Sequence, residues 1–419
     1  MRALLVTAAA AVAVAAASGA ESCGCRGNAT LPPAGISMIF LENPDHPYRP
    51  PPCASKNRCE SPLVRSPSIS RTVIDVGMNS GVDYTLPGIK NGLGVLSFEA
   101  VPQTAHKTLL HMKALGKKRD RPVEELQITP GELPDAATIA RARAVFEAGR
   151  GGAALVAGGA SDAVAALPVF LADGQARRNF AASLADANMP LTGTAHSKAV
   201  TVGTVAAVPI DALLGAPPLP DVGLLKVDAQ GWEAHVFRGA RALLCAPGKV
   251  RYVEFEFSAR MIANAAGGAK KGGAGADDVR APVAMLEQLR ASGRMCFALT
   301  SHVHGPSHIA KGGVQPHRAR GVVDFERFAR QLRRPLAPAD EEAACGGLGC
   351  HAEIVCVEMC SDEPLERAVA RLLNGIQHKS AGWPEEKRRA YERQFALALR
   401  EELAAVDGAR GTRWHVSSA

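Results

Sequence analysis

A glycine-rich segment, VIDVGMNSG at 73–81, carries the clearest chemical signal in the sequence. Gly77 and Gly81 would let the backbone approach a bound ligand closely. The start of a helix after such a turn offers free N–H groups to a carboxylate or a phosphate. The dinucleotide fingerprint G-x-G-x-x-G would need a glycine where Asn79 stands, which disfavours a nicotinamide or flavin site. The segment therefore predicts a ligand-binding turn of another kind.

Acidic residues end two further predicted strands. Glu99 ends the strand predicted at 94–100, where a Rossmann-type site needs a carboxylate that accepts hydrogen bonds from both ribose hydroxyls. Its alternative role is to cap the helix after Pro102. Asp162 follows the strand predicted at 153–160, where it could reach an adenine amino group. A plain turn residue is an equally good interpretation of Asp162.

Two carboxylates are candidates for the chemistry itself. Asp228 ends the strand predicted at 222–228 and is the first choice for a general base. Its alternative role is an N-terminal cap for the helix predicted at 231–244. Glu254 and Glu256 alternate within one strand, and carboxylates on a largely apolar strand must be paired or belong to a site. We expect one or both to line an acceptor pocket, and Glu254 joins Asp228 as a candidate catalytic residue.

Three histidines raise the question of a metal ion. His302, His304 and His308 fall within seven residues and could ligate zinc or manganese. No carboxylate lies close to them in the sequence, and glycine and proline surround them. This setting favours a solvated or acceptor-facing loop, so no metal is predicted.

The elements that must position these residues alternate along the chain. Short apolar runs predict strands at 71–77, 94–100, 153–160, 222–228, 250–257, 294–300 and 352–359. Helices are predicted at 104–115, 231–244 and 282–289. This alternation predicts an α/β fold, with a Rossmann-like, doubly wound and mostly parallel sheet. Ligands of such sheets bind beyond the carboxyl ends of the strands, where the residues above are expected to meet.

The flanking segments have a different character. Residues 1–20 combine Arg2, an apolar run and a small-residue cleavage site, which predicts a signal peptide, with a retained signal anchor or plastid targeting as alternatives. A Pro- and Cys-rich leader is expected at 21–68, and a helical extension at 361–419. The main domain is assigned to 69–360, with insertions at 116–152 and 301–351.

Composition and cysteine usage restrict the setting. The net charge of +7 is spread along the chain and aromatic residues make up only 5%, so nucleic acid is not an expected partner. Ten cysteines and an Asn28-Ala29-Thr30 glycosylation triplet favour the secretory pathway. Cys356 belongs to a C-terminal cluster for which disulfides are favoured over zinc, whereas Cys245 and Cys296 are expected to be buried thiols. Oligomeric state is not predicted.

Several segments, taken in order, resemble one family. VIDVGMNSG, SFEAVP at 97–102, LVAGGASD at 155–162, VPIDALL at 208–214 and LLKVDAQGWEAHVFRGARALL at 224–244 are together similar to an FkbM-type S-adenosylmethionine-dependent methyltransferase domain. The resemblance implies a class I methyltransferase fold and S-adenosylmethionine as the cofactor. It departs from the family at Gln230, where glutamate is usual. The cofactor-binding residues it implies are Asp75, Gly77, Asn79, Gly81, Glu99 and Asp162.

The activity implied by the resemblance is methyl transfer to an oxygen of a carbohydrate or another small acceptor. Together with the predicted signal peptide, this activity implies an enzyme that acts in the lumen of the endoplasmic reticulum or Golgi, or one that is secreted. The alternative is a non-catalytic secreted binding module that keeps the methyltransferase fold, an idea motivated by Gln230 and the long insertions. A nicotinamide oxidoreductase on the same sheet is a third interpretation, which the missing glycine disfavours.

Overall fold

The computed structural model describes residues 23, 34–37, 72–147, 151–172, 183–185, 199–268, 278–299, 322–333, 352–359 and 386. The predicted signal peptide, nearly all of the leader, the histidine segment and nearly all of the helical extension lie outside these residues. The expected domain boundaries remain predictions.

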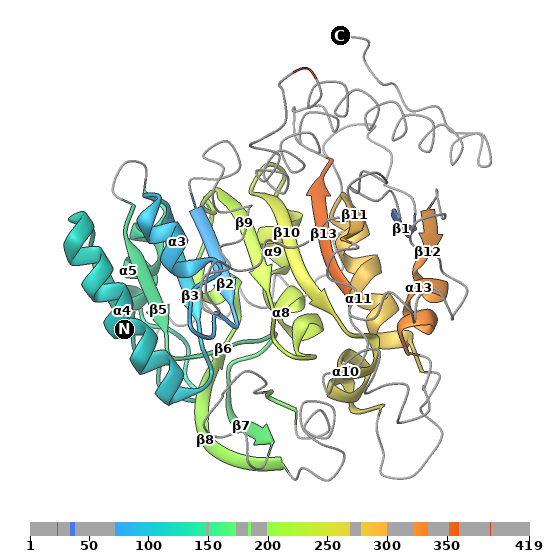
Figure 1. The fold of residues 1–419 in the computed structure, drawn as a ribbon, viewed down its shortest axis with the longest axis horizontal. Coiled ribbons are helices and arrows are strands. Elements are labelled where there is room, and N and C mark those ends of the chain that lie inside the picture. The colour runs from blue at the N-terminus through green and yellow to red at the C-terminus, as the bar shows by residue number, and fades with distance from the viewer. Residues whose placement is uncertain are drawn as a thin grey trace, which may run out of the picture.

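A large sheet runs through the described part of the chain, and its strands alternate with helices as predicted (Figure 1). Neighbouring strands are parallel, except that β13 (Ala352–Glu358) and β12 (Val322–Asp324) run antiparallel to the strands beside them. The predicted α/β class with a mostly parallel sheet is therefore confirmed. In spatial order the strands are β12 (Val322–Asp324), β1 (Gly35–Ser37), β11 (Arg294–Leu299), β13 (Ala352–Glu358), β10 (Val250–Phe257), β9 (Val222–Val227), β2 (Thr72–Val76), β3 (Gly94–Phe98), β5 (Ala153–Val156) and β4 (Val123–Leu126).

Helices cover both faces of this sheet, which explains why its central strands are almost continuously apolar. One face carries Val73, Val95 and Leu224 and packs against α3 (Thr85–Lys90) and α4 (Pro102–Arg119). The opposite face packs against the remaining helices. These are α5 (Ala136–Ala144), α7 (Ile210–Leu214), α8 (Glu233–Gly239), α9 (Arg241–Cys245), α10 (Ala259–Ala263) with the π-helical turn η2 (Asn264–Gly268), α11 (Arg280–Ala291) and α13 (Phe325–Arg333).

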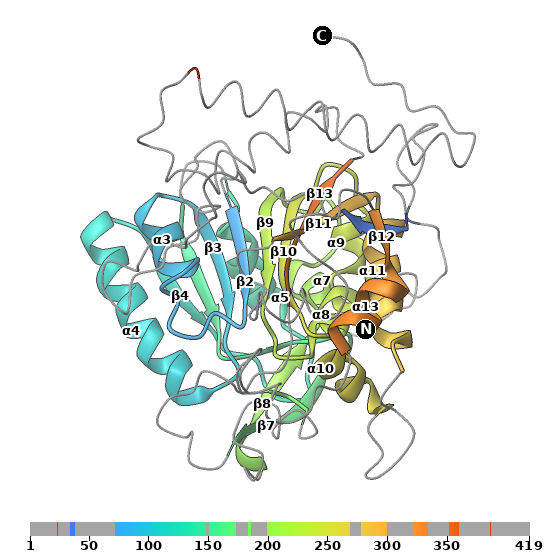
Figure 2. The same ribbon diagram turned by 45° about the vertical axis from the view of Figure 1, so that its right-hand side comes forward.

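A second, three-stranded sheet adjoins the carboxyl ends of the parallel strands, as Figures 1 and 2 show. It contains β6 (Gly158–Ala160), β8 (Ala199–Val208) and β7 (Ala165–Ala172) in that order. The segment 153–160, predicted as one strand, leaves the large sheet at Val156 and enters the small one at Gly158. A Cβ on Gly158 would lie 2.5 Å from the carbonyl oxygen of Ala206, so the two chain segments are in direct backbone contact.

Some elements differ from the sequence predictions. β4 lies within the segment assigned to an insertion and was not predicted, because its VEEL sequence lacks the apolar run of a central strand. The helix predicted at 231–244 is two helices, α8 and α9, separated at Ala240. A Cβ on Gly239 would lie 1.8 Å from the carbonyl oxygen of Ser161, which shows how closely α8 approaches the small sheet.

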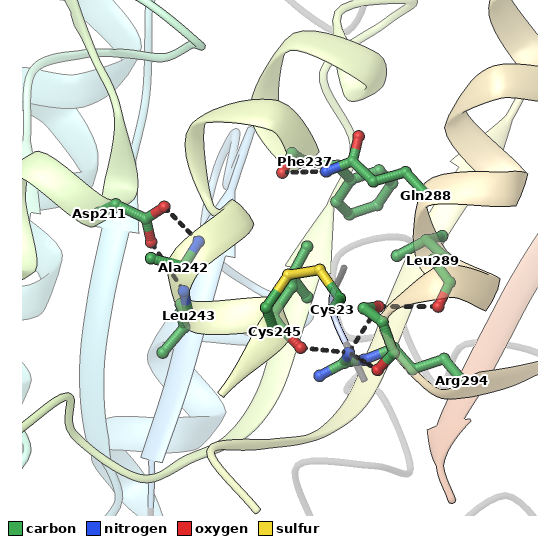
Figure 3. The surroundings of a disulfide bond; sticks show 11 residues. Cys23, Asp211, Phe237, Ala242, Leu243, Cys245, Gln288, Leu289 and Arg294 are labelled. Carbon is green, nitrogen blue, oxygen red and sulfur yellow. Dashed lines mark hydrogen bonds between the residues drawn. A yellow bond between two sulfur atoms is a disulfide. The ribbon is translucent and has the colours of Figure 1, made fainter. Parts of the chain in front are cut away.

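Two disulfide bonds join distant parts of the described chain. Cys296 and Cys356 are bonded and lie directly opposite each other on β11 and β13. Cys245, at the end of α9, is bonded to Cys23 (Figure 3). The expectation that Cys245 and Cys296 are buried thiols is therefore wrong. Their partners are 222 and 60 residues away in the sequence and become adjacent only in the folded chain. Beside the second bond, the buried Arg294 donates hydrogen bonds to carbonyl oxygens.

Within the described residues, none of the helices has both the length and the apolar character that crossing a membrane requires.

Candidate active site

The turn that leaves β2 and the loop that leaves β9 are in backbone contact. Gly77 has φ +72°, and a Cβ at this position would lie 1.8 Å from the carbonyl oxygen of Asp228. The N–H of Asp228 donates to the carbonyl oxygen of Val76 at 3.0 Å. Only glycine fits here, because any side chain would push the two loops apart.

The end of β3 holds the glycine turn from the other side. The N–H groups of Gly77 and Met78 both donate to the carbonyl oxygen of Phe98, each at 3.1 Å. The N–H of Asn79, which has a left-handed φ of 52°, donates to Oε2 of Glu99 at 2.8 Å. Glu99 therefore holds the glycine turn in place through this hydrogen bond.

The second carboxylate oxygen of Glu99 accepts the N–H of Val101 at 2.8 Å, just before α4 begins. Glu99 thus also makes a hydrogen bond at the start of α4, as its alternative role as a helix cap predicted in part. Burial raises the pKa of Glu99 to about 7, although the amides of Val101 and Asn79 and the charge of Lys226 act in the opposite direction.

A crevice opens at this edge of the sheet. It encloses about 630 Å³, a volume that includes the part open to solvent. Four of the predicted site residues line it together: Gly77, Asn79, Glu99 and Asp228. The small sheet and the loop after β9 complete the wall. The other lining residues are Val76, Phe98, Ala100, Gly158, Gly159, Ala160, Val169, Ser183, Leu184, Ala229, Gln230 and Trp232.

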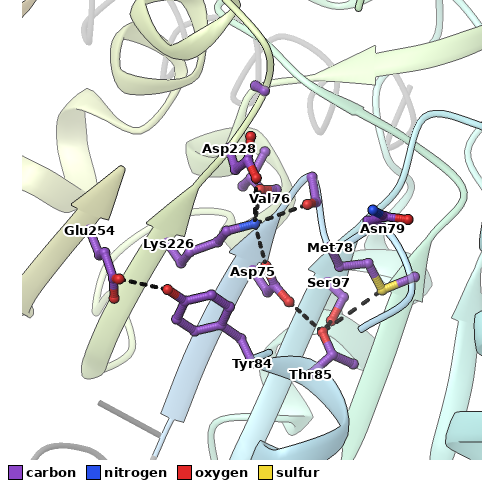
Figure 4. Close-up of polar contacts among 12 residues, drawn as sticks. Asp75, Val76, Met78, Asn79, Tyr84, Thr85, Ser97, Lys226, Asp228 and Glu254 are labelled. Atoms are coloured by element: carbon purple, nitrogen blue, oxygen red, sulfur yellow. Dashed lines mark hydrogen bonds and ion pairs between the residues drawn. The ribbon is translucent and has the colours of Figure 1, made fainter. Parts of the chain in front are cut away.

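Asp75 and Gly81, also predicted to bind the cofactor, do not belong to this lining. Asp75 is buried; its Oδ2 accepts the hydroxyl of Thr85 at 2.6 Å, and its Oδ1 lies 3.3 Å from Nζ of Lys226 (Figure 4). Gly81 closes the turn by donating its N–H to the carbonyl oxygen of Met78 at 2.8 Å. Both residues support the turn from within the protein.

Lys226 is a site residue to which no role was assigned from the sequence. Its buried ammonium donates to the carbonyl oxygens of Gly77 at 2.9 Å and Val76 at 3.3 Å. Nζ also lies 3.8 Å from Oδ2 of Asp228. Burial alone would lower the pKa of Lys226, but the charges of Asp75 and Asp228 raise it further, so the side chain stays protonated. The available sequence signal was its position two residues before Asp228, which places both side chains on one strand face.

Asp228 faces the crevice and does not cap the following helix. Its side chain is 36% exposed, and its Oδ1 accepts a hydrogen bond from Nε2 of Gln230 at 2.7 Å. The backbone N–H groups before α8 are instead bound by Glu233, whose Oε1 accepts from Ala229 at 2.9 Å and Gly231 at 3.1 Å. The helix-cap interpretation of Asp228 is therefore wrong, and its carboxylate is available at the crevice.

Glu254 lies on the same sheet face as Lys226 but outside the crevice lining. The hydroxyl of Tyr84 donates to its Oε1 at 2.6 Å (Figure 4). Burial raises the pKa of Glu254 to about 7, although the Tyr84 hydroxyl and Lys226 lower it. Glu256 lies opposite Glu353 in the neighbouring strand, and burial followed by the nearby carboxylates raises its pKa well above the usual value.

Asp162 lies outside the crevice lining. Its carboxylate is 2.8 Å from Nε of Arg238 and 3.0 Å from Nδ1 of His235. The His235 ring stacks on Trp232 at a centroid distance of 3.8 Å, and the Trp232 Nε1 donates to Oγ of Ser161 at 3.3 Å. Asp162 thus helps to hold an aromatic side chain of the crevice wall.

Across the described ranges, no group of three or more His, Cys, Asp or Glu side chains is placed to hold a metal ion. His302, His304 and His308 lie outside these ranges.

The fold and the crevice define a class of protein: an α/β domain with a large, mostly parallel sheet and an open crevice at the carboxyl ends of its strands, consistent with a methyltransferase fold. Residues 75–281 match the family model described as the methyltransferase FkbM domain. The chain therefore carries a domain of the FkbM methyltransferase family, as its sequence motifs predicted, and this membership indicates a methyltransferase. Comparisons with curated proteins and with solved structures returned no match.

Proposed function

We propose that this protein is an S-adenosylmethionine-dependent O-methyltransferase. The observation that carries the proposal is the meeting of Gly77, Asn79, Glu99 and Asp228 in one crevice of a chain that belongs to the FkbM family. The crevice is open to solvent, and the absence of a side chain at Gly77 lets the glycine turn contact the backbone of Asp228 at its edge.

The residues present suit this cofactor. Each carboxylate oxygen of Glu99 accepts one backbone N–H and retains a second lone pair. Glu99 can therefore accept hydrogen bonds from ribose hydroxyls without releasing the glycine turn. The turn from Gly77 to Asn79 would hold the amino-acid portion, and the small sheet would cover the base. When bound, the cofactor supplies a methyl group on a sulfonium, which already makes a good leaving group.

Asp228 is the residue we propose as general base. Its carboxylate is partly exposed at the crevice, and its Oδ2 lies 3.8 Å from the ammonium nitrogen of Lys226. In the proposed step Asp228 would accept the proton of the acceptor hydroxyl, which makes the oxygen a better nucleophile toward the methyl group that the cofactor would supply. The protein's further contributions are alignment of the acceptor oxygen and exclusion of water by the crevice walls.

For the acceptor we propose a hydroxyl of a carbohydrate or a similar small molecule, methylated in the secretory pathway. The compartment rests on the signal-like residues 1–20 and on the Asn28-Ala29-Thr30 triplet. The two disulfide bonds are compatible with an oxidising compartment.

Calorimetric titration with S-adenosylmethionine and S-adenosylhomocysteine tests the cofactor assignment. Glu99→Ala is expected to weaken both affinities roughly 10- to 100-fold, because hydrogen bonds to a charged group contribute about 1.5–3 kcal/mol. Glu132→Ala, at an exposed turn, is the matched control and should bind as the wild type does. Equal affinities for wild type and Glu99→Ala would refute the ribose assignment.

Transfer of a labelled methyl group to a panel of glycans tests the activity. We expect transfer by the wild type and a loss of at least tenfold in Asp228→Asn. Cofactor binding without transfer to any acceptor would favour the alternative, a non-catalytic binding module.

A further inference from the structure

The ammonium of Lys226 contacts two loops that line the crevice, one after β2 and one after β9. It donates to the carbonyl oxygens of Val76 and Gly77, the last residue of β2 and the first of the glycine turn. The same carbonyl of Val76 accepts the N–H of Asp228. One side chain from β9 therefore holds the start of the turn, at the point where the β9 loop also contacts it.

Carboxylates surround this ammonium on the other sides. Oδ1 of Asp75 lies at 3.3 Å and Oδ2 of Asp228 at 3.8 Å. Glu254 is opposite Lys226 in the register of β10 and β9, and the ring of Tyr84 lies 5.4 Å from Nζ. The ammonium thus bridges a buried carboxylate, which does not reach the crevice, and an exposed carboxylate, which does.

Two roles can explain a lysine in this setting. The first is to neutralise Asp75, which is buried and would be costly as an unpaired charge. The second is to position the loops, because three tetrahedrally arranged N–H donors can reach two carbonyl oxygens and a carboxylate at once. The contacts to Val76 and Gly77 belong to the second role, since neutralising Asp75 does not require them.

We infer that Lys226 is a positioning residue, which holds the glycine turn against the end of β9 and orients the Asp228 carboxylate toward the crevice. The part that concerns Asp228 rests on the proposed function. The part that concerns the turn does not, because hydrogen exchange of the ligand-free protein can measure it.

The test separates positioning from charge neutralisation. Asp75→Asn/Lys226→Met removes both charges, and the amide oxygen that replaces the carboxylate at position 75 can still accept the Thr85 hydroxyl. Lys226→Arg keeps the positive charge but replaces a compact ammonium with a planar fork. Asp75→Asn alone keeps the lysine, and Lys249→Arg, beside Asp221, is the matched control for lysine-to-arginine exchange.

We expect the double variant and Lys226→Arg to fold, and the amides of Gly77, Met78 and Asn79 to exchange at least tenfold faster in both. We also expect S-adenosylhomocysteine to bind them at least tenfold more weakly. Both effects should exceed those of Asp75→Asn, while Lys249→Arg stays within about threefold of the wild type. Wild-type exchange rates and wild-type product affinity in either folded variant would overturn the inference.

The two proposals fail differently. A wild-type chain that binds neither S-adenosylmethionine nor S-adenosylhomocysteine would refute the proposed function. The exchange rates of the turn in Lys226→Arg, measured without ligand, would still decide whether Lys226 positions it.

Discussion

Replacing Gly77 by alanine is the most direct test of how the crevice is built. The added Cβ would lie 1.8 Å from the carbonyl oxygen of Asp228 and 2.8 Å from its carbonyl carbon. Because real Cβ contacts essentially never fall below 3.0 Å, the loops must separate by about 1.2 Å in a closely packed region. We expect Gly77→Ala to damage both stability and ligand binding.

The expected magnitude has two parts. A non-glycine residue at φ +72° loses roughly 1–2 kcal/mol from backbone strain. Separation of the loops also breaks the 3.0 Å hydrogen bond from Asp228 to Val76, a loss of about 1 kcal/mol. The free energy of unfolding should therefore fall by about 2–3 kcal/mol. Because the shift displaces Asp228 by about 1 Å, the rate of methyl transfer should fall about 100-fold.

Gly131→Ala is the matched control. Gly131 has φ +83°, but a Cβ there would meet nothing within 4 Å. Urea unfolding should show a loss of about 1–2 kcal/mol in this variant, with S-adenosylhomocysteine affinity unchanged in calorimetry. The proposed backbone contact between the two loops is wrong if Gly77→Ala loses no more free energy of unfolding than Gly131→Ala and binds S-adenosylhomocysteine as tightly as Gly131→Ala does.

Two further predictions concern pH and the disulfide between β11 and β13. Burial raises the pKa of Glu254 from 4.5 to about 7, so its contribution to stability is fully present below pH 4.5 and is lost as the pH rises to about 7. Glutamine at this position does not titrate. Between pH 5 and pH 8 the free energy of unfolding of Glu254→Gln should therefore fall by up to about 3 kcal/mol less than that of the wild type. Urea titrations that show the same pH dependence in both proteins would contradict the raised pKa of Glu254. Cys296→Ala/Cys356→Ala opens a link across 60 residues, which should lower the free energy of unfolding by about 4 kcal/mol while product affinity stays near the wild-type value. Unchanged urea unfolding would contradict that expectation.

The sequence predicted the central strands well because they are buried on both faces. Their apolar runs need no knowledge of neighbours to be recognised, and β10 was predicted with its observed bounds. Strands of lower apolar content, such as β4, depend on their partners and were missed. The division of 153–160 between two sheets also lies beyond local pattern, since it follows from the contact of Gly158 with Ala206.

The sequence was enough to locate the edge of the sheet that carries the site. Parallel strands bring their carboxyl ends together, so the glycine turn, Glu99 and Asp228 had to be near one another once the strands were recognised. Tertiary structure decided which carboxylates reach the crevice, because pairing register and the turns beyond the strand ends direct each side chain. Asp75 and Glu254 both lie in register with Lys226 on the face that packs against α3 and α4. They belong to a buried network, whereas Glu99 and Asp228 line the open crevice. The contacts of Lys226 and of the bonded cysteines also depend on the tertiary structure, because their partners lie up to 222 residues away in the chain.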